Sequence, residues 1–282
     1  MYTELIKTDV LSALEKILAE KRIVQFSEMV KVGEEKGGVS EKTQIKKPSA
    51  DVKKNELAEL KKVCNSKGLV HRWSFNGDAK DSVGGVDAEI HEGVFDNGQC
   101  FLQGGWISLN RAATAFSDSF TIEVWVTELK SDLGACVFRM MHDWNGDYNR
   151  NILRWATAET SACTGWIHAH LNDGSWFGSG RTVLGRVTIG EEYYAAMTVC
   201  NTGDGFELAA YRYVPKTGKW FRWSERRHNQ ELMKIEQFEL GPACCREWVN
   251  ITGSYNECRV WTRCLSSAEI EKSAKSGPDK VN

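Results

Sequence analysis

From residue 69 onward, hydrophobic and polar residues alternate, and this period of two is the feature that most restricts the fold. In "LVHRWSF" the side chains of Leu69, His71, Trp73 and Phe75 fall on one face of an extended chain. Successive side chains of a strand point to opposite faces, so alternation indicates a strand with one buried face. The segments "SFTIEVWVTEL", "EYYAAMTVC", "GFELAAYRYV" and "YNECRVW" behave in the same way.

Turn-forming residues separate these segments. Asparagine, aspartate and glycine accept the backbone angles of tight hairpin turns. They occur together at 76–78, 84–85, 96–98, 172–174, 203–205 and, with lysine and threonine, at 216–218. Many short strands with regular turns and little helix are typical of a β-sandwich or barrel, so we expect an all-β domain.

One helix is expected near the C-terminus, in "CLSSAEIEKSAKSGPD". Ser266 and Glu269 have the spacing of a capping box, and Leu265 and Ile270 have that of a hydrophobic staple. Gly277, followed by proline, ends the helix. This short helix directly follows the strand "SYNECRVWTR", and we expect that last strand to lie beside the first strand, "HRWSFN".

Residues 1–68 differ from the rest and contain none of the eleven tryptophans. Helical spacing of leucines predicts an amphipathic helix over 3–22, and a second short helix follows near 57–63. The charged, glycine-broken segment 32–54 is typical of a linker. Two interpretations stay open, an oligomerising or docking helix and a solvated spacer, and the shortness of the pattern favours the spacer.

The motifs "LVHRWSFNGDAKDSVGG", "GQCFLQGGWISL", "SFTIEVWVTEL", "EEYYAAMTV" and "GSYNECRVWTRCLSSAEIEKSAKSGPD" together resemble the bacterial laminin-G-like (LamG) domains. The resemblance covers 69–276 and leaves 277–282 as a tail. It implies a concanavalin A-like jelly-roll β-sandwich with a short C-terminal helix, here behind a helical N-terminal extension. It also implies a secreted or cell-surface protein that binds glycans or proteins, often beside calcium. The opening residues lack the features of a signal peptide, so the compartment stays open.

Two loops carry the candidate ligand-binding residues. Sugar sites combine an aromatic ring, which covers the C–H face of the sugar, with polar side chains that bond its hydroxyls. The loops "HDWNGDYNRN" and "NDGSWF" offer both kinds of side chain. The candidates are Trp144, Tyr148, Asn172, Asp173 and Trp176.

The first of these loops is also the candidate calcium site. Asp143, Asn145 and Asp147 alternate, and calcium takes six to eight oxygen ligands. The match to an EF-hand fails, because Tyr148 stands where glycine is required and Arg154 where glutamate is required. A polar hairpin connection is therefore the favoured interpretation, and calcium the alternative.

Composition and motifs exclude several classes of function. The net charge of −2 gives no reason to expect a nucleic-acid partner, and no apolar run is long enough to span a bilayer. The basic–aromatic stretch 218–228 fits an edge strand better than a nucleic-acid site.

No catalytic motif or paired-carboxylate spacing is present, so no catalytic residue is assigned. His168 and His170 share a strand face without a visible third metal ligand. Most of the nine cysteines are expected to be reduced and buried.

The sequence thus predicts a non-catalytic binding module, first for carbohydrate. The alternative is a protein-adhesion or assembly module in which residues 1–68 form a homo-oligomer. That alternative predicts a larger species that becomes monomeric when residues 1–68 are deleted.

Overall fold

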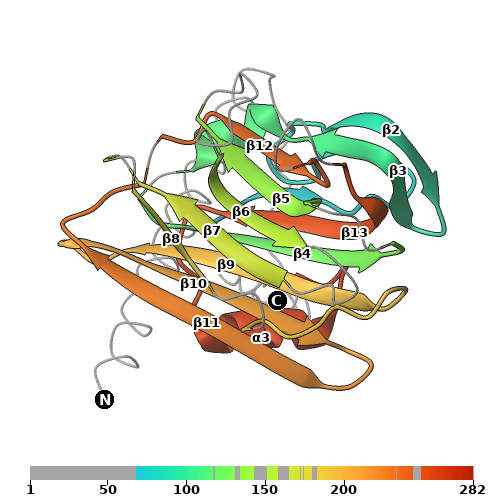
Figure 1. Ribbon diagram of the computed structural model, residues 1–282. Coiled ribbons are helices and arrows are strands. Elements are labelled where there is room, and N and C mark those ends of the chain that lie inside the picture. The colour runs from blue at the N-terminus through green and yellow to red at the C-terminus, as the bar shows by residue number, and fades with distance from the viewer. Residues whose placement is uncertain are drawn as a thin grey trace, which may run out of the picture. The chain divides into compact units, whose positions relative to one another are not determined.

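The structure is a computed structural model that describes residues 68–116, 118–130, 134–142, 151–157, 165–171, 173, 175–179, 183–232, 234–243 and 249–281 (Figure 1). The helices predicted before residue 68 lie outside the described residues. The rest is an all-β fold with one short C-terminal helix, as the sequence predicts. The strands are β1 (Leu69–Trp73), β2 (Glu89–Asp96), β3 (Gln99–Ser108), β4 (Phe120–Glu128), β5 (Cys136–Met141), β6 (Asn151–Thr157), β7 (Gly165–His170), β8 (Trp176–Gly178), β9 (Glu192–Asn201), β10 (Gly205–Val214), β11 (Lys219–His228), β12 (Gln237–Leu240) and β13 (Thr252–Trp261). The helices are the 3-10 helix η1 (Asn110–Ala115) and the α-helix α3 (Ser267–Ser276).

The strands form one continuous sheet that curls over itself, in the order β11-β10-β9-β4-β13-β3-β12-β5-β6-β7-β8 (Figure 1). Strand β13 is the point at which the layers join. It pairs with β4 along one edge, and on its other edge it pairs first with β3 and then with β1. The predicted pairing of the first and last strands is therefore confirmed, with Trp73 opposite Cys258.

Hydrophobic side chains fill the space between the layers. Phe120, Ile122, Val124 and Val126 of β4 all face this core, as their alternation predicts. The opposite face of the same layer is also covered, because Trp125 belongs to a second apolar cluster that includes Ile270 of α3. Helix α3 lies against this outer face (Figure 1). Its capping box forms as predicted, with Ser266 and Glu269 bonded to each other's backbone N–H.

The opening motif forms a turn organised by one carboxylate. Asp81 accepts hydrogen bonds from the backbone N–H of Arg72, Val83 and Gly84, and it lies 2.6 Å from the ring of His71. A Cβ atom at Gly84 would lie 2.4 Å from the His71 ring, so only glycine fits. The turn therefore depends on the residues "DSVGG" that mark it in the sequence.

A buried group of charges joins β1, β13 and the C-terminal tail. Glu257 is fully buried and accepts hydrogen bonds from Arg72, Arg259 and the backbone N–H of Asp279. Burial alone would raise the pKa of Glu257, but the hydrogen bond from Arg72 and the charge of Arg259 bring that pKa below its ordinary value. Glu257 is therefore ionised and holds the two arginines in place.

The described cysteines fall into two groups. Cys100 and Cys258 are free and buried, as expected, Cys136 is also buried, and burial raises the pKa of Cys100 to about 11. Cys200 and Cys264 instead form a disulfide, which differs from the expectation of reduced thiols. The bond links the end of β9 to the segment before α3. The two residues are 64 positions apart in the sequence, and their Cα atoms lie 5.3 Å apart. Alternation could not reveal this contact between distant segments.

Replacing Glu257 by glutamine is expected to lower the free energy of unfolding by about 3–5 kcal/mol, because Arg259 would stay buried without its charge partner. Urea unfolding measures the change. Exposed Glu271→Gln is the control and should cost less than about 0.5 kcal/mol. Because the pKa of Glu257 is lowered in the folded chain, its contribution to the free energy of unfolding is complete above the ordinary carboxyl pKa. That contribution is lost as the pH falls through the lowered pKa of the folded chain. Equal costs for the two variants would contradict the prediction.

Replacing Cys200 by serine is expected to lower the free energy of unfolding by about 4 kcal/mol, since the bond closes a long loop in the unfolded chain. Adding reductant to the native chain should have a similar effect. Cys258→Ala is the control, because it keeps the Cys200–Cys264 disulfide and should therefore lose stability on adding reductant, as the native chain does. A non-reducing digest in which the peptides that carry Cys200 and Cys264 separate would contradict the assignment.

Candidate functional site

The curling of the sheet brings its two end strands, β8 and β11, face to face. Phe177 of β8 packs near Phe206 and Trp223, with ring centroids 5.9 and 6.5 Å away. The guanidinium of Arg227 lies over the Phe177 ring at 4.3 Å. Side chains therefore close the sandwich along this seam, although no strand pairing between β8 and β11 is present in the described part of the chain.

An open cavity of about 880 Å³ lies among the loops at one end of the sandwich. We call it the rim groove. It is bounded by the residues before β4, the β7–β8 turn, the β9–β10 turn and the loop from β11 to β12. Its polar wall includes Asp118, Asp173, Asn201 and Gln230, and its apolar lining includes Phe116 and Leu232.

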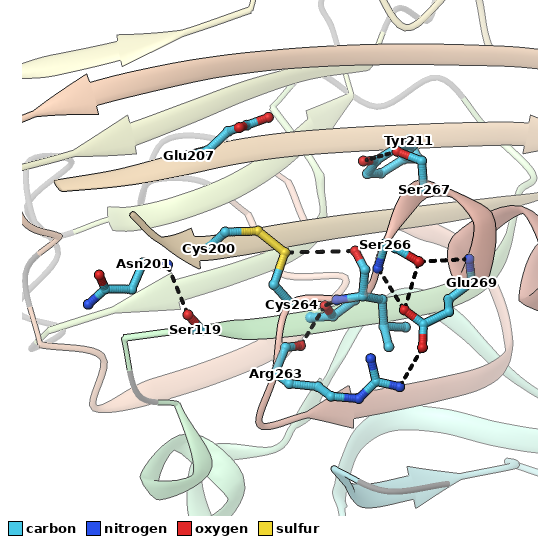
Figure 2. The surroundings of a disulfide bond; sticks show 12 residues. Ser119, Cys200, Asn201, Glu207, Tyr211, Arg263, Cys264, Ser266, Ser267 and Glu269 are labelled. Atoms are coloured by element: carbon cyan, nitrogen blue, oxygen red, sulfur yellow. Dashed lines mark hydrogen bonds and ion pairs between the residues drawn. A yellow bond between two sulfur atoms is a disulfide. The ribbon is translucent and has the colours of Figure 1, made fainter. Parts of the chain in front are cut away.

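The β9–β10 side of the groove is fixed by short-range bonds. The backbone N–H of Asn201 donates to Ser119 Oγ at 2.8 Å, and its side-chain amide donates to Asp118 at 3.5 Å. Figure 2 shows Asn201 directly after Cys200, whose disulfide partner Cys264 precedes the N-cap of α3. The disulfide thus ties one wall of the rim groove to the helix-bearing layer.

Asp173 holds the β7–β8 side of the groove. Its Oδ1 accepts hydrogen bonds from the backbone N–H and the hydroxyl of Ser175, and its Oδ2 accepts one from the Gln230 amide at 3.1 Å. The bonds from Ser175 are the main reason that the pKa of Asp173 lies below its usual value. Asp173 therefore stays ionised in mildly acidic solution, with its carboxylate at the groove.

Asp204, in the β9–β10 turn, is bonded by two side chains of β11. Arg226 and His228 of β11 each lie 2.9 Å from its carboxylate oxygens. The hydrogen bond from Arg226, followed by that from His228, holds the pKa of Asp204 well below its usual range. Asp204 therefore fixes the turn onto β11, and its charge is largely neutralised there.

A second polar surface lies on the outer face of β5–β8. His168 and His170 share this face, as the sequence predicts, and Arg154 contacts His168 from the neighbouring strand. The ring of Trp176 meets His168 edge-on at 4.8 Å and is 65% exposed. Arg139, next to Arg154, binds Glu239 at 2.6 Å. Of these side chains, Trp176 is exposed and the others are buried, so among the described residues an aromatic ring is accessible on this face.

The structure separates the candidate residues that it describes. Asp173 lines the rim groove, whereas Trp176, three residues later, is not part of its lining and stands on the outer face. Trp144, Tyr148 and Asn172 lie outside the described residues, and so do the candidate metal ligands Asp143, Asn145 and Asp147. Among described residues no cluster of metal-ligating side chains is found. The calcium hypothesis remains a prediction.

Several groove residues were not identified from the sequence. Asn201 and Gln230 stand in turns and loops, where polar residues are common, and Asp118 precedes a strand without a motif. The turn residues at 203–205 predict a hairpin and give no sign of a groove. These residues lie together because four loops meet at the groove. The alternation of hydrophobic and polar residues predicts strands but not which loops meet.

Comparison with known proteins supports the fold. No family model matches the sequence, and no curated protein matches it. Among solved structures, a mutant of Trypanosoma rangeli sialidase that displays trans-sialidase activity is similar, with 16% identity and a TM-score of 0.52. The alignment covers 72% of this chain and 32% of the sialidase, so the chain spans about a third of that protein. Likeness at this identity shows a shared fold alone.

A smaller neighbour is the CBM40 of the Ruminococcus gnavus IT-sialidase, solved bound to α2,3 sialyllactose. It has 14% identity and a TM-score of 0.47, and the alignment covers 67% of this chain and 98% of that one.

None of the helices in the described part of the chain has the length and apolar character needed to cross a bilayer.

The buried imidazole of His168 gives a prediction for acid. Burial, with the charges of Arg154 and then His170, lowers its pKa to about 3. The unfolded chain binds a proton near the ordinary value of 6.5 and the folded chain does not. The free energy of unfolding should therefore fall as the pH drops from about 6.5 toward 3. His168→Gln should make that fall less steep in urea unfolding, and titration of the native His168 ring near pH 6.5 by NMR would contradict this.

Proposed function

We propose that the chain is a non-catalytic module that binds carbohydrate in the rim groove. The observation that carries the proposal is the composition of the groove, in which carboxylate and amide side chains stand beside apolar side chains. Sugars present hydroxyls and apolar C–H faces together, so a complementary site needs both kinds of surface. A volume of about 880 Å³ suits a ligand of two or three sugar rings.

The polar groups of the groove are held in place before a ligand arrives. Asp173 and Gln230 bond each other across two loops, and Asn201 bonds Asp118. Pre-organised groups lose less conformational entropy on binding, which favours affinity. The planar amide and carboxylate groups match the paired hydroxyls of a sugar ring.

The electrostatics of the groove support binding without hydrolysis. A glycosidase needs one carboxyl group with a raised pKa to protonate the leaving oxygen. The pKa values of Asp173 and Asp204 are instead lowered by their hydrogen bonds. These two carboxylates therefore accept hydrogen bonds and do not donate protons near neutral pH.

The Cys200–Cys264 disulfide supports a location in an oxidising compartment, since such bonds persist mainly in secreted and surface proteins. This agrees with what the LamG resemblance implies. The LamG assignment itself and the calcium site at 143–147 remain predictions.

A glycan array probed with the full chain tests the proposal, run once with calcium and once with chelator. We expect Gln230→Ala to weaken binding about tenfold, because it removes hydrogen bonds in the groove worth roughly 1–2 kcal/mol. Trp176→Ala is the matched control on the outer face and should bind like the native chain. Thermal unfolding confirms that both variants are folded.

Two outcomes would overturn the proposal. If Trp176→Ala abolishes binding and Gln230→Ala does not, the ligand lies on the outer face and not in the rim groove. A blank array in both conditions would reject carbohydrate as the ligand and favour the alternative of protein adhesion. Loss of binding under chelation alone would add calcium to the proposed site.

A further inference from the structure

We infer that the rim groove selects glycans that carry a protonated amine over neutral or acidic glycans. This inference rests on the proposed function and specifies its ligand class. It follows from the charges at the groove, where four carboxylates face one lysine. The acidic residues are Asp118, Asp173, Asp204 and Glu231, and the lysine is Lys234.

The groove charges differ in how far neighbours compensate them. Asp204 is paired with Arg226 and His228, so it adds little net charge. Lys234 lies 3.3 Å from Glu236, which offsets its positive charge. Among the described residues that line the groove, Lys234 is the only cation, and a carboxylate already engages it.

Asp118 and Asp173 are bonded by neutral groups. The amide of Asn201 reaches Asp118, and Ser175 and Gln230 bond Asp173. Within the described ranges no lysine or arginine forms an ion pair with either carboxylate. These bonds orient the two carboxylates without cancelling their charge, and those to Asp173 also lower its pKa. Two full negative charges therefore stay at the groove wall.

An ammonium group on a sugar ring complements this arrangement. It can donate up to three hydrogen bonds, and bonds between charged partners are roughly twice as strong as neutral ones. Phe116 and Leu232 offer apolar surface to the C–H face of the same ring. An acetylated amine keeps the ring shape but loses the charge, and a sugar carboxylate would be repelled by Asp118 and Asp173.

Isothermal titration of the full chain with three matched trisaccharides tests the inference. The probes are chitotriose, which carries amines, N,N′,N″-triacetylchitotriose, which is neutral, and trigalacturonic acid, which is acidic. At pH 6 we expect chitotriose to bind at least about tenfold tighter than the acetylated form, with the acid weakest. The preference should shrink with added salt, because salt screens exposed charges.

Isosteric variants locate the effect. Asp118→Asn and Asp173→Asn should each reduce the preference for chitotriose several-fold, with little change for the acetylated probe. Glu271→Gln on α3 removes an exposed carboxylate outside the groove lining and should leave the preference intact. Thermal unfolding of each variant identifies any loss of fold, and Asp118→Glu, which keeps the charge, should retain the preference.

The failures of the two proposals are distinguishable. Equal or tighter binding of the acetylated or acidic probe overturns the amine preference but leaves carbohydrate binding standing. Unchanged preference in both asparagine variants shows that the amine does not lie at these carboxylates and also overturns the inference. If no probe binds and the array is blank as well, carbohydrate binding fails together with the inference.

Discussion

The architecture depends on a carboxylate that has no contact with water. Glu257 is on the strand where the two layers join, and it is satisfied only when Arg72 of β1, Arg259 and the backbone of Asp279 are all in position. A buried charge without its partners is costly, so the first strand, the last strand and the tail must assemble together. Strand β13 pairs with β4 on one edge and with β3 on the other, so β3 lies in one layer and β4 in the other.

This junction decides where a ligand can be held. Because β13 joins the layers on one side, the opposite side is left to β8 and β11, which meet through Phe177 and Arg227. Loops from both layers converge at the end of that seam and form the rim groove. The outer face of β5–β8 is a different environment, since Arg139, Arg154, His168 and His170 are buried there and Trp176 is exposed. The rim groove, with its exposed carboxylates, and this outer face are thus two separate regions of one domain.

The sequence predicted the fold well because strands, turns and caps are local. Alternation identified the buried face of β4, and the capping box of Ser266 formed as expected. The site was predicted only in part. Asp173 and Trp176 were grouped because they are close in sequence, yet the β7–β8 turn sends them to different surfaces. The Cys200–Cys264 bond and the Asp173–Gln230 contact join residues distant in sequence, and composition carries no information about such pairs.

The pairing of β1 with β13 has a topological consequence. Arg72, near the start of the described domain, lies within 3.4 Å of Asp279, near its end. Entry and exit of the polypeptide are therefore adjacent, as in domains that tolerate circular permutation or insertion into a surface loop of a host protein. A domain with adjacent ends can be inserted into a surface loop of a host protein, because the two ends of that loop can stay close together.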